Sequence, residues 1–523
     1  MKTEHPETIL LIHPPVAKPS EPPAGVARLS GALSAHGLRH EVVDLNLECL
    51  LNLLAGNIEL SDTWTSRAAK NRGRNTDALR TWRTYSSIDR YRRTVNDLHR
   101  LLHAQSNTKN IRLSFSDYRD SRLSPLKSSD LLKAMESFQD NLFYPYFSNR
   151  LFEIFEKGRA HVVGLSLNYL SQALCTFAII GFIKKMAPET RIILGGGLVT
   201  SWLRSGTWRE QFQGVVDRAV AGAGEAPLLS LLGVHIQENY AYCPSFLSFP
   251  LEDYCAPGPI LPYSSSAGCY WGKCLFCPEK AEGNRYIPIA GEVVTRDLGE
   301  LARDLKPVLI HLVDNAVSPA IMEDLCARPP GIPWYGFARL TRHLAEDDFC
   351  LALRHSGCVM LKLGLESGSQ TVLDAMKKGN ELSRSSGALK SLTRAGIATY
   401  VYLLFGTPWE TRDAAYETLE FVAQHSPYIS FLNVAVFNLP AKGPDAGHLK
   451  TTGFYEGDLT LYTDFLHPSG WDRKHVKQFL DKEFRRHPAI QPILRRNPPG
   501  FGSNHAPFFS MQTKRGWPSG PVK

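Results

Sequence analysis

Short apolar segments alternate with helical segments along most of this 523-residue chain. In the first half, TILLIHPP, EVVDLNL, HVVGLSLNY and RIILGGG are apolar runs, separated by helical stretches such as GVARLSGALSAHG and SQALCTFAIIGFIKKMAP. Continuous apolar runs are typical of strands buried on both faces, and regular strand–helix alternation is typical of a parallel sheet. The pattern predicts an α/β protein whose N-terminal domain is doubly wound and Rossmann-like.

The alternation continues in the second half, after a linker rich in Pro, Tyr and Ser. The segments PYSSSAG, VLIHLVDN, WYGFAR, VMLKLGLES, ATYVYLLFG and ISFLNVAVFN are the expected strands. Six strand–helix units are fewer than the eight of a closed barrel, so we expect a partial (β/α)6 barrel. The predicted domains are 1–238, with a helical insertion at about 50–155, then the barrel at 239–455 and a small C-terminal extension at 456–523.

Composition excludes several classes of protein. Hydrophobic residues make up 43% and charged residues 21%, as in globular proteins, and no apolar run reaches the roughly 20 residues of a membrane-spanning helix. We recognise no secretion signal at the N-terminus, so we expect a cytoplasmic protein without a membrane partner. Ten cysteines are too sparse for a disulfide scaffold.

The formal charge of +8 is concentrated in part in residues 66–100, where Trp82, Tyr85 and Tyr91 are interspersed with arginines. A basic stripe with aromatic residues can contact nucleic acid or an acidic peptide. A solvated helical face explains the same pattern and is the commoner case, so we do not expect a nucleic-acid partner.

Three cysteines lie within nine residues in SSSAGCYWGKCLFCPEK: Cys269, Cys274 and Cys277. Clustered cysteines in a reducing compartment indicate metal or redox chemistry. Structural zinc sites usually have four ligands, yet no Cys or His lies between Cys277 and His311. Three thiolates can hold a 4Fe–4S cluster with one iron open, and that iron can chelate the amine and carboxylate of a small ligand such as S-adenosylmethionine (SAM).

Together with GLESGSQTVLDAMKKG and YLLFGTPWET, the cysteine motif resembles the radical SAM superfamily. The resemblance implies that Cys269, Cys274 and Cys277 bind a 4Fe–4S cluster, whose electron cleaves SAM to a 5′-deoxyadenosyl radical. It also implies an electron donor such as flavodoxin or ferredoxin. The spacing departs from the family pattern, because four residues rather than three separate Cys269 from Cys274. No catalytic residue beyond the cluster ligands is predicted.

The same resemblance implies a set of SAM-binding residues. Phe276 is expected on the adenine, Glu366 on the ribose and Arg339 on the cofactor carboxylate. The other expected contacts are Ser367, Gln370, Gly406 and Pro408. Asp314, Asn315 and Glu410 follow predicted strands and are weaker candidates, as are Asn504 and His505 in the tail.

Residues 8–235, apart from the insertion, resemble the cobalamin-binding-type domain that precedes the barrel in one branch of the superfamily. Glycine at strand ends lets a ligand approach the backbone, and Gly195, Gly196, Gly222 and Gly224 are the candidate cobalamin contacts. The Asp-x-His-x-x-Gly motif of other cobalamin proteins is missing. A degenerate domain that contacts substrate is therefore a second interpretation.

The leading hypothesis is a cobalamin-dependent radical SAM methyltransferase that acts on an unactivated carbon of a small molecule or peptide. The alternative within the family is rearrangement, cyclisation or oxidation without methyl transfer. An RNA methylthiotransferase is disfavoured because such enzymes carry a second cysteine triplet. From another class, a zinc-binding interaction protein would explain the cysteines but not the motifs at Glu366 and Gly406.

Overall fold

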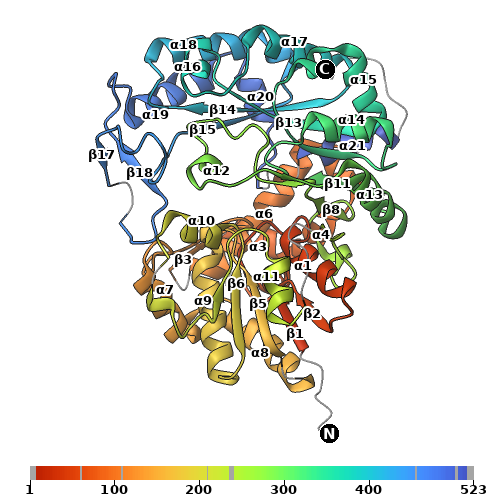
Figure 1. Ribbon diagram of the computed structural model, residues 1–523, viewed down its shortest axis with the longest axis vertical. Helices are drawn as coiled ribbons and strands as arrows, with labels where there is room; N and C mark the ends of the chain where they lie inside the picture. The colour runs from red at the N-terminus through yellow and green to blue at the C-terminus, as the bar shows by residue number, and fades with distance from the viewer. Residues whose placement is uncertain are drawn as a thin grey trace. The chain divides into compact units, whose positions relative to one another are not determined.

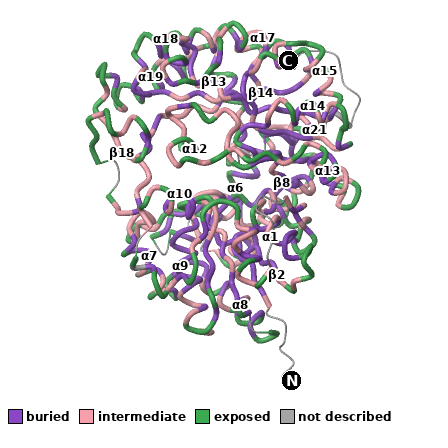
Figure 2. The backbone as a smooth tube through the Cα atoms, viewed as in Figure 1, coloured by how far each residue is buried: buried purple, intermediate pink, exposed green. Residues whose placement is uncertain are grey.

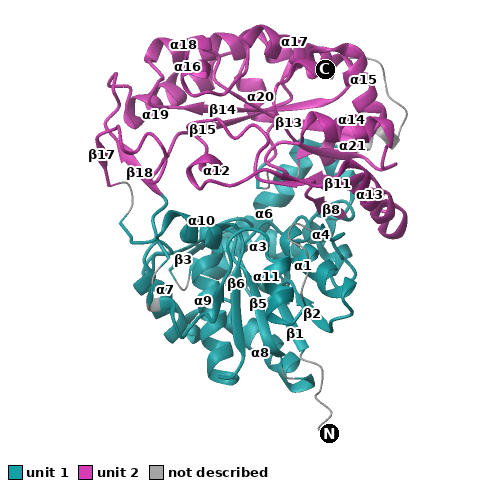
Figure 3. Ribbon diagram, viewed as in Figure 1, with its two compact units in different colours: residues 1–259, 455–461, 499–502 teal, residues 260–454, 462–498, 503–523 magenta. Residues whose placement is uncertain are grey.

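The computed structural model describes residues 8–58, 62–107, 110–158, 160–208, 210–234, 241–453, 456–500 and 505–514. The chain forms two compact units (Figure 3). Unit 1 contains residues 1–259, 455–461 and 499–502, and unit 2 contains residues 260–454, 462–498 and 503–523. Among the described helices, none has both the length and the apolar character needed to cross a membrane.

Unit 1 is built on a five-stranded parallel sheet with the order β2–β1–β5–β6–β7 (Figure 1). The strands are β1 (Thr8–Ile12), β2 (His40–Val43), β5 (Ala160–Ser166), β6 (Arg191–Gly195) and β7 (Arg218–Ala219). The principal helices around it are α1 (Ala24–Ala35), α9 (Leu170–Met186), α10 (Gly197–Ser205) and α11 (Glu225–Leu231). Residues 9–12 of β1 are at most 1% exposed, as expected of a central strand in such a sheet. The predicted doubly wound architecture is confirmed.

The segment EVVDLNL was predicted as one strand, and this is wrong for its second half. β2 ends at Val43, and helix α2 (Leu45–Ala55) begins two residues later. The side chain of Asp44 accepts a hydrogen bond from the backbone N–H of Leu47 at 3.0 Å, which is the contact of a helix N-cap. The cap ends the strand and starts the helix.

The described residues between about 50 and 155 are mainly helical and also contain a short antiparallel hairpin of β3 (Ile111–Leu113) and β4 (Tyr118–Asp120). The helices of this insertion after α2 are α3 (Thr63–Lys70), α4 (Arg72–Leu79), α5 (Trp82–Tyr85), α6 (Ile88–Asn107), α7 (Ser128–Glu136) and α8 (Tyr144–Lys157). The long helix α6 buries Tyr91, Val95, Leu98 and Leu102, which gives the insertion an apolar core of its own.

The linker predicted within the barrel domain belongs to unit 1. Residue 239 lies outside the described residues, but the following segment packs on the N-terminal sheet domain. Phe246 and Tyr254 are 1% and 2% exposed, and the Tyr254 hydroxyl donates to the Asp44 carboxylate at 2.6 Å. These buried contacts place the boundary at Ile260.

Unit 2 contains a six-stranded parallel sheet with the order β15–β14–β13–β12–β11–β8. The strands are β8 (Ile260–Tyr263), β11 (Leu309–Leu312), β12 (Trp334–Ala338), β13 (Cys358–Glu366), β14 (Ala398–Phe405) and β15 (Phe431–Val436). The main connecting helices are α13 (Gly291–Leu305), α14 (Pro319–Ala327), α15 (Asp347–His355), α16 (Gln370–Ala375), α17 (Leu382–Arg394) and α18 (Arg412–Gln424). Figure 2 shows the buried strands enclosed by helices with exposed outer faces. The predicted partial barrel is confirmed.

The first barrel strand lies earlier than PYSSSAG. It ends at Tyr263; Ser264 and Ser265 follow in a loop, and Ser266 begins the short strand β9 (Ser266–Ala267), which pairs with β10 (Ile287–Pro288). The Asp314 carboxylate accepts hydrogen bonds from the Ser265 N–H at 3.0 Å, the Ser265 hydroxyl at 2.8 Å and the Ser266 hydroxyl at 2.6 Å. These bonds satisfy the serine donors outside the sheet, which turns the chain away from β8.

The predicted C-terminal extension does not form a separate unit. Most of its described part packs with the barrel in unit 2, where residues 439–465 include a three-stranded antiparallel sheet. The sheet consists of β16 (Leu439–Pro440), β17 (Thr451–Thr452) and β18 (Tyr462–Phe465), and its first two strands precede the extension. The described elements of the extension itself are β18, α19 (Arg473–Lys482), α20 (Gln491–Arg496) and α21 (Pro507–Lys514). Phe479 and Phe484 pack against Phe405 of β14 at ring distances of 6.1 and 5.2 Å. This apolar packing explains why the extension joins the barrel.

Candidate active site

The three clustered cysteines lie on the loop after β8, and the barrel holds this loop at both ends. At the start, the Asn315 side chain donates to the Gly268 carbonyl at 3.3 Å. Gly268 has φ +72, and a Cβ there would lie 2.3 Å from the Arg285 carbonyl oxygen. At the end, the Leu275 N–H donates to the Met376 carbonyl at 3.1 Å. Asp314, through its bonds to Ser265 and Ser266, and Asn315, through its bond to Gly268, therefore position the start of the cysteine loop.

Trp271 occupies the longer first gap of the cysteine motif. Its indole N–H donates to the Lys377 carbonyl at 3.0 Å, and its ring covers Gly379 so closely that a Cβ there would lie 2.3 Å from the ring. The guanidinium of Arg339 and the ammonium of Lys273 lie 4.2 and 4.8 Å from the ring centre. Trp271, within the four-residue gap, thus anchors the loop to the segment after α16 in the same unit.

The thiols suit a metal cluster. Burial raises the pKa of Cys277 to about 11; a backbone hydrogen bond from Glu279 opposes this rise, and the nearby Cys274 and Cys269 contribute to it. Burial also raises the pKa of Cys274, against the lowering effect of Lys378 and Arg339. Only thiolates bind metal, so a cation must offset the free-energy cost of ionising these buried thiols. Three free thiols with two cations beside Cys274 match a thiolate-bound cluster that carries net negative charge.

Arg339, predicted to bind the SAM carboxylate, lies at the end of β12 beside the cysteine loop and is 7% exposed. One guanidinium nitrogen lies 3.8 Å from the Cys274 sulfur, and another donates to the Lys378 carbonyl. These contacts give Arg339 a role in holding the loop. Its pairing with the cofactor stays a prediction.

Glu366 ends β13 in a conformation that costs energy. Its φ is +69, in the left-handed region that side chains other than glycine rarely adopt. One carboxylate oxygen accepts from the Lys378 ammonium at 2.8 Å, and both side chains are largely buried, at 14% and 8% exposed. Backbone strain of this kind concentrates at functional sites. The sequence analysis identified Glu366 but missed Lys378, although both lie in the segment GLESGSQTVLDAMKKG.

Phe276, predicted to contact the adenine, lies in an apolar cluster of the barrel unit. It packs against Val372, Met376 and Ala414, together with Trp409. The Lys378 ammonium lies 5.6 Å from the centre of its ring. Phe276 therefore joins the cysteine loop to the Glu366 ion pair and to the Gly406–Trp409 turn.

Ser367 and Gln370, both predicted to contact the cofactor, also contact other residues of the protein through their side chains. The Ser367 hydroxyl lies 3.2 Å from that of Thr418 and is fully buried. The Gln370 amide donates to Asp374 at 2.8 Å and to the Asn380 carbonyl at 3.0 Å, and its oxygen accepts from the Leu382 N–H at 3.0 Å. These bonds position the loop that carries Lys378. Cofactor contacts by Ser367 and Gln370 remain predictions.

The turn of Gly406 and Pro408 is held by the buried Glu410. Gly406 has φ +77, and its N–H donates to a Glu410 oxygen at 2.5 Å. The Trp471 indole N–H donates to the same oxygen at 2.9 Å, whereas Thr411 caps α18. Glu410 is 1% exposed, and burial raises its pKa to about 7. Its role is to fix the turn.

This buried carboxyl predicts a pH dependence of stability. The folded pKa of about 7 lies above the ordinary value of 4.5, so from about pH 4.5 to pH 7 the folded chain retains a proton that the unfolded chain releases. The free energy of unfolding therefore falls as pH rises through this window, by up to about 3 kcal/mol. Glu410→Gln stays neutral and should lose this decline, measured as denaturant midpoints at pH 5 and pH 8. The exposed Glu420→Gln should behave as the parent, and an unchanged decline in Glu410→Gln would contradict the assignment.

Polar and aromatic side chains gather on the strands of the barrel sheet. The Lys362 ammonium of β13 lies 3.2 Å from the His311 imidazole of β11, and both residues are buried. The same ammonium lies 5.0 and 4.9 Å from the ring centres of Tyr335 and Phe337 on β12. Tyr402 of β14 packs edge-on against Phe337 at 5.0 Å. The sequence analysis did not single out this cluster, because its members lie in four strands.

His505, a candidate from the tail, is 3% exposed and stacks on Tyr400 at 4.4 Å. It also packs edge-on against Phe431 at 4.7 Å, so it contacts two barrel strands, β14 and β15. The structure thus places His505 in the aromatic packing of the barrel. Asn504 lies outside the described residues.

The glycines of unit 1 gather at the carboxyl edge of its sheet. Gly196 has φ +108 and its Cβ would lie 2.4 Å from the Leu167 carbonyl, and Gly222 has φ +78, so the backbone itself requires glycine at both positions. A Cβ at Gly195 would meet neighbouring atoms only at 3.8 Å, and one at Gly224 would meet Leu29 at 3.2 Å. Packing therefore does not require glycine at Gly195. Cobalamin contacts by these four glycines remain predictions.

Comparisons with known proteins identify the barrel. Residues 263–422 match the radical SAM superfamily. An uncharacterized methyltransferase of Pyrococcus horikoshii is 26% identical over 186 residues, which cover 34% of this chain and 40% of that protein. An anaerobic magnesium-protoporphyrin IX monomethyl ester cyclase of Rubrivivax gelatinosus is 27% identical over 105 residues, 20% of this chain and 19% of that one. The matched segments thus span less than half of either curated relative.

Two groups of solved structures share the fold over nearly the whole chain. TsrM from Kitasatospora setae, a radical SAM methyltransferase solved with its tryptophan substrate and a SAM analogue, covers 98% of this chain and 96% of its own, with TM-score 0.59 and 14% identity. The cobalamin-dependent radical SAM enzyme OxsB covers 91% of this chain and 67% of its own, with TM-score 0.58 and 13% identity. At such identities the likeness establishes the fold.

Proposed function

We propose that this chain, whose residues 263–422 belong to the radical SAM superfamily, is a cobalamin-dependent radical enzyme that transfers a methyl group to an unactivated carbon. The observation that carries the proposal is the convergence of the cysteine loop, the Glu366–Lys378 pair and the Gly406 turn at the carboxyl ends of barrel strands. A zinc-binding interaction protein would have no need of the last two features.

In this proposal, each group of residues has a distinct task. Cys269, Cys274 and Cys277 hold a 4Fe–4S cluster, which supplies the electron that cleaves SAM when it is bound. Phe276 provides an apolar surface for the adenine, and the free oxygen of Glu366 accepts from the ribose hydroxyls. Trp271 and Arg339 keep the loop rigid, which holds the reacting atoms close together. A reduced flavodoxin or ferredoxin is the proposed electron donor.

The cofactor of unit 1 separates methyl transfer from the alternatives. We assign cobalamin to the strand-end glycines Gly195, Gly196, Gly222 and Gly224, because parallel α/β sheets bind ligands at the carboxyl ends of their strands. The substrate would be a small molecule or peptide bound near the Lys362–His311 pair, where a buried cation favours an anionic group such as a carboxylate. If the chain does not bind cobalamin, rearrangement, cyclisation or oxidation becomes the leading function.

Corrinoid retention tests the methyl-transfer proposal. The chain, reconstituted anaerobically and incubated with hydroxocobalamin, should retain about one corrinoid per chain after gel filtration, measured from its absorption spectrum. Gly195→Val should retain at least about tenfold less, because the side chain occupies the edge where the ring approaches. Gly158→Val, at a glycine with open space around it, should retain as much as the parent. SAM cleavage without corrinoid retention by the parent would overturn cobalamin dependence but leave the radical chemistry in place.

A further inference from the structure

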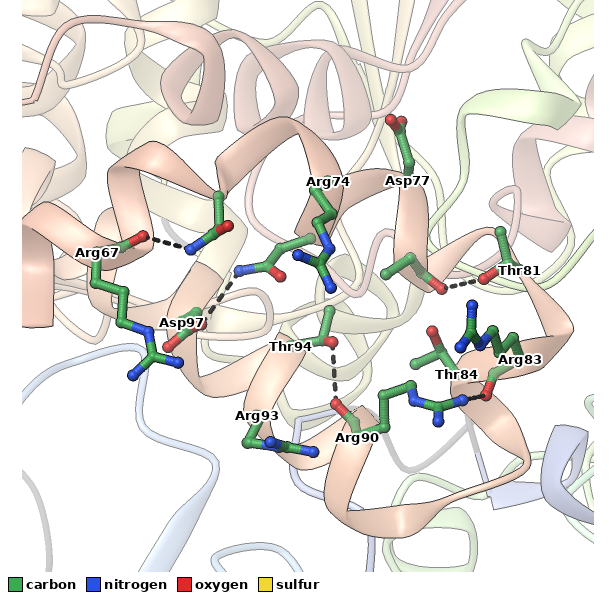
Figure 4. Close-up of a pocket in the computed structure, with 13 residues that line it drawn as sticks. Arg67, Arg74, Asp77, Thr81, Arg83, Thr84, Arg90, Arg93, Thr94 and Asp97 are labelled. Atoms are coloured by element: carbon green, nitrogen blue, oxygen red, sulfur yellow. Dashed lines mark hydrogen bonds between the residues drawn. The ribbon is translucent and has the colours of Figure 1, made fainter.

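A cavity of about 890 Å³ lies within the helical insertion of unit 1, and arginines dominate its lining (Figure 4). Helices α3, α4, α5 and α6 contribute Arg67, Arg74, Arg83, Arg90 and Arg93. The volume is in the range of small-molecule sites. The cavity is separate from the strand-end glycines to which we assign cobalamin.

The lining carries excess positive charge. Its carboxylates are Asp77 and Asp97, so five arginines face two acids. Asp97 accepts from the Asn75 amide at 3.2 Å, and Asp77 lies 4.0 Å from Arg80, which does not line the cavity. Among the described residues, no carboxylate forms an ion pair with any of the five lining arginines, and the side-chain hydrogen bonds of Arg90 and Arg93 go to backbone carbonyls. The guanidinium groups are therefore available for an external anion.

The arginines approach the cavity from different helices. Figure 4 shows the side chains of Arg74, Arg83 and Arg90 around the same space, although they come from α4, α5 and α6. The Arg90 guanidinium donates to the Arg83 carbonyl at 2.6 Å, and the Thr94 hydroxyl donates to the Arg90 carbonyl at 3.0 Å. The first bond connects the start of α6 to α5, and the second lies within α6. Donors that come from several helices suit a ligand with more than one anionic group.

The aromatic residues of this basic segment do not face the cavity. Tyr85 and Tyr91 are 1% and 0% exposed and pack against each other at 5.3 Å, and Trp82 packs edge-on against Tyr85 at 6.5 Å. Among the thirteen lining residues there is no aromatic ring. Proteins that bind single-stranded nucleic acid combine a basic groove with rings on which the bases stack. The cavity has the charge for phosphate without the rings for bases.

We propose that this cavity binds a small ligand that carries a diphosphate group. The guanidinium fork binds phosphate oxygens in pairs, and a diphosphate can engage arginines of two helices at once. The lining threonines and asparagines supply further polar groups for the rest of the ligand. The inference does not depend on cobalamin or on SAM cleavage, because the cavity and its charges are independent of both.

Calorimetric titration of the full chain with inorganic pyrophosphate tests the proposal. The parent should bind pyrophosphate, with an affinity that decreases as salt is raised. The double substitution Arg74→Gln and Arg83→Gln should weaken binding at least about tenfold, because two charge-assisted contacts are lost. Arg100→Gln, on α6 but outside the cavity, should bind as the parent does. Arg74→Lys retains the charge without the fork and should give an intermediate affinity.

Three results would overturn the proposal. They are an absence of binding heat with pyrophosphate, an equal affinity in the double variant and the parent, and tighter binding of a single-stranded RNA or an acidic peptide that the same substitutions abolish. If the double variant does not fold, as judged by circular dichroism, Arg74→Gln and Arg83→Gln are measured singly. Each single substitution should then weaken pyrophosphate binding relative to Arg100→Gln.

Discussion

Replacing Cys274 with alanine should abolish the reductive cleavage of SAM, with a loss of at least about three orders of magnitude in the rate of 5′-deoxyadenosine formation. Cys274 is 8% exposed and lies beside Arg339 and Lys378, so no other thiolate can take its place without a change in the loop. After anaerobic reconstitution, the parent should contain about four irons per chain, as one 4Fe–4S cluster requires. The measurements are iron content and the chromatographic yield of 5′-deoxyadenosine.

A second cysteine of the same unit provides the control for this experiment. Cys326 on α14 is partly buried and free, and it lies outside the motif. Cys326→Ala should retain the iron content and the cleavage rate of the parent. Undiminished cleavage by Cys274→Ala would remove Cys274 from the cluster, and a colourless parent with one bound zinc would exclude the radical mechanism.

Glu366→Ala should weaken SAM binding by about 10- to 100-fold, because a hydrogen bond to a charged group contributes about 1.5–3 kcal/mol. The carboxylate is held in place by Lys378 at 2.8 Å, and its second oxygen is expected to accept from the ribose. Glu366→Gln keeps an acceptor for Lys378 but loses the charge, so we expect SAM binding to weaken by about 10-fold, the lower limit of this range. Equilibrium binding of SAM to the reconstituted chain measures both variants.

Stability must be measured beside affinity for these variants. Alanine at position 366 keeps the left-handed φ of +69 and leaves the buried Lys378 without its carboxylate, so part of the effect is structural. A glutamate of the same unit, Glu381, pairs with Arg384 on an exposed surface, and Glu381→Ala should change neither affinity nor stability. Parent-like SAM affinity in Glu366→Gln and Glu366→Ala would assign Glu366 to structure alone.

The architecture could be predicted from sequence because its strands are strongly apolar and separated by clear helices. β11, β12, β14 and β15 fall within the predicted segments, and β13 begins one residue earlier than predicted, at Cys358. The errors in strand bounds arose where hydrogen bonds from a side chain determine the end of a strand. Asp44 caps α2 and shortens the second strand, and Asp314 binds the serines that had been assigned to the first barrel strand. Periodicity does not reveal such hydrogen bonds, because they depend on the partner residue.

The cysteine triplet and the motifs at Glu366 and Gly406 were also evident from sequence, because each motif is contiguous. The residues that hydrogen-bond to these motifs were not evident from sequence. Lys378 follows Glu366 by twelve residues and meets it across a loop that Gln370 holds. Trp471 reaches Glu410 from 61 residues away. The bonds of Gln370 to Asp374, Asn380 and Leu382 were likewise not evident, and its contact with the cofactor stays a prediction.

The sequence by itself determined the parallel α/β architecture and the three thiols, since burial on both faces and ligand chemistry require particular residue types at short spacing. Only the tertiary structure decided how charge and hydrogen bonding are distributed among residues distant in sequence. It explained the longer cysteine gap through the contacts of Trp271 with Lys377 and Gly379. It also showed that arginines of the basic segment line a cavity, whereas Tyr85 and Tyr91 of the same segment are buried away from it. Such arrangements depend on how helices and loops pack, which local sequence patterns do not specify.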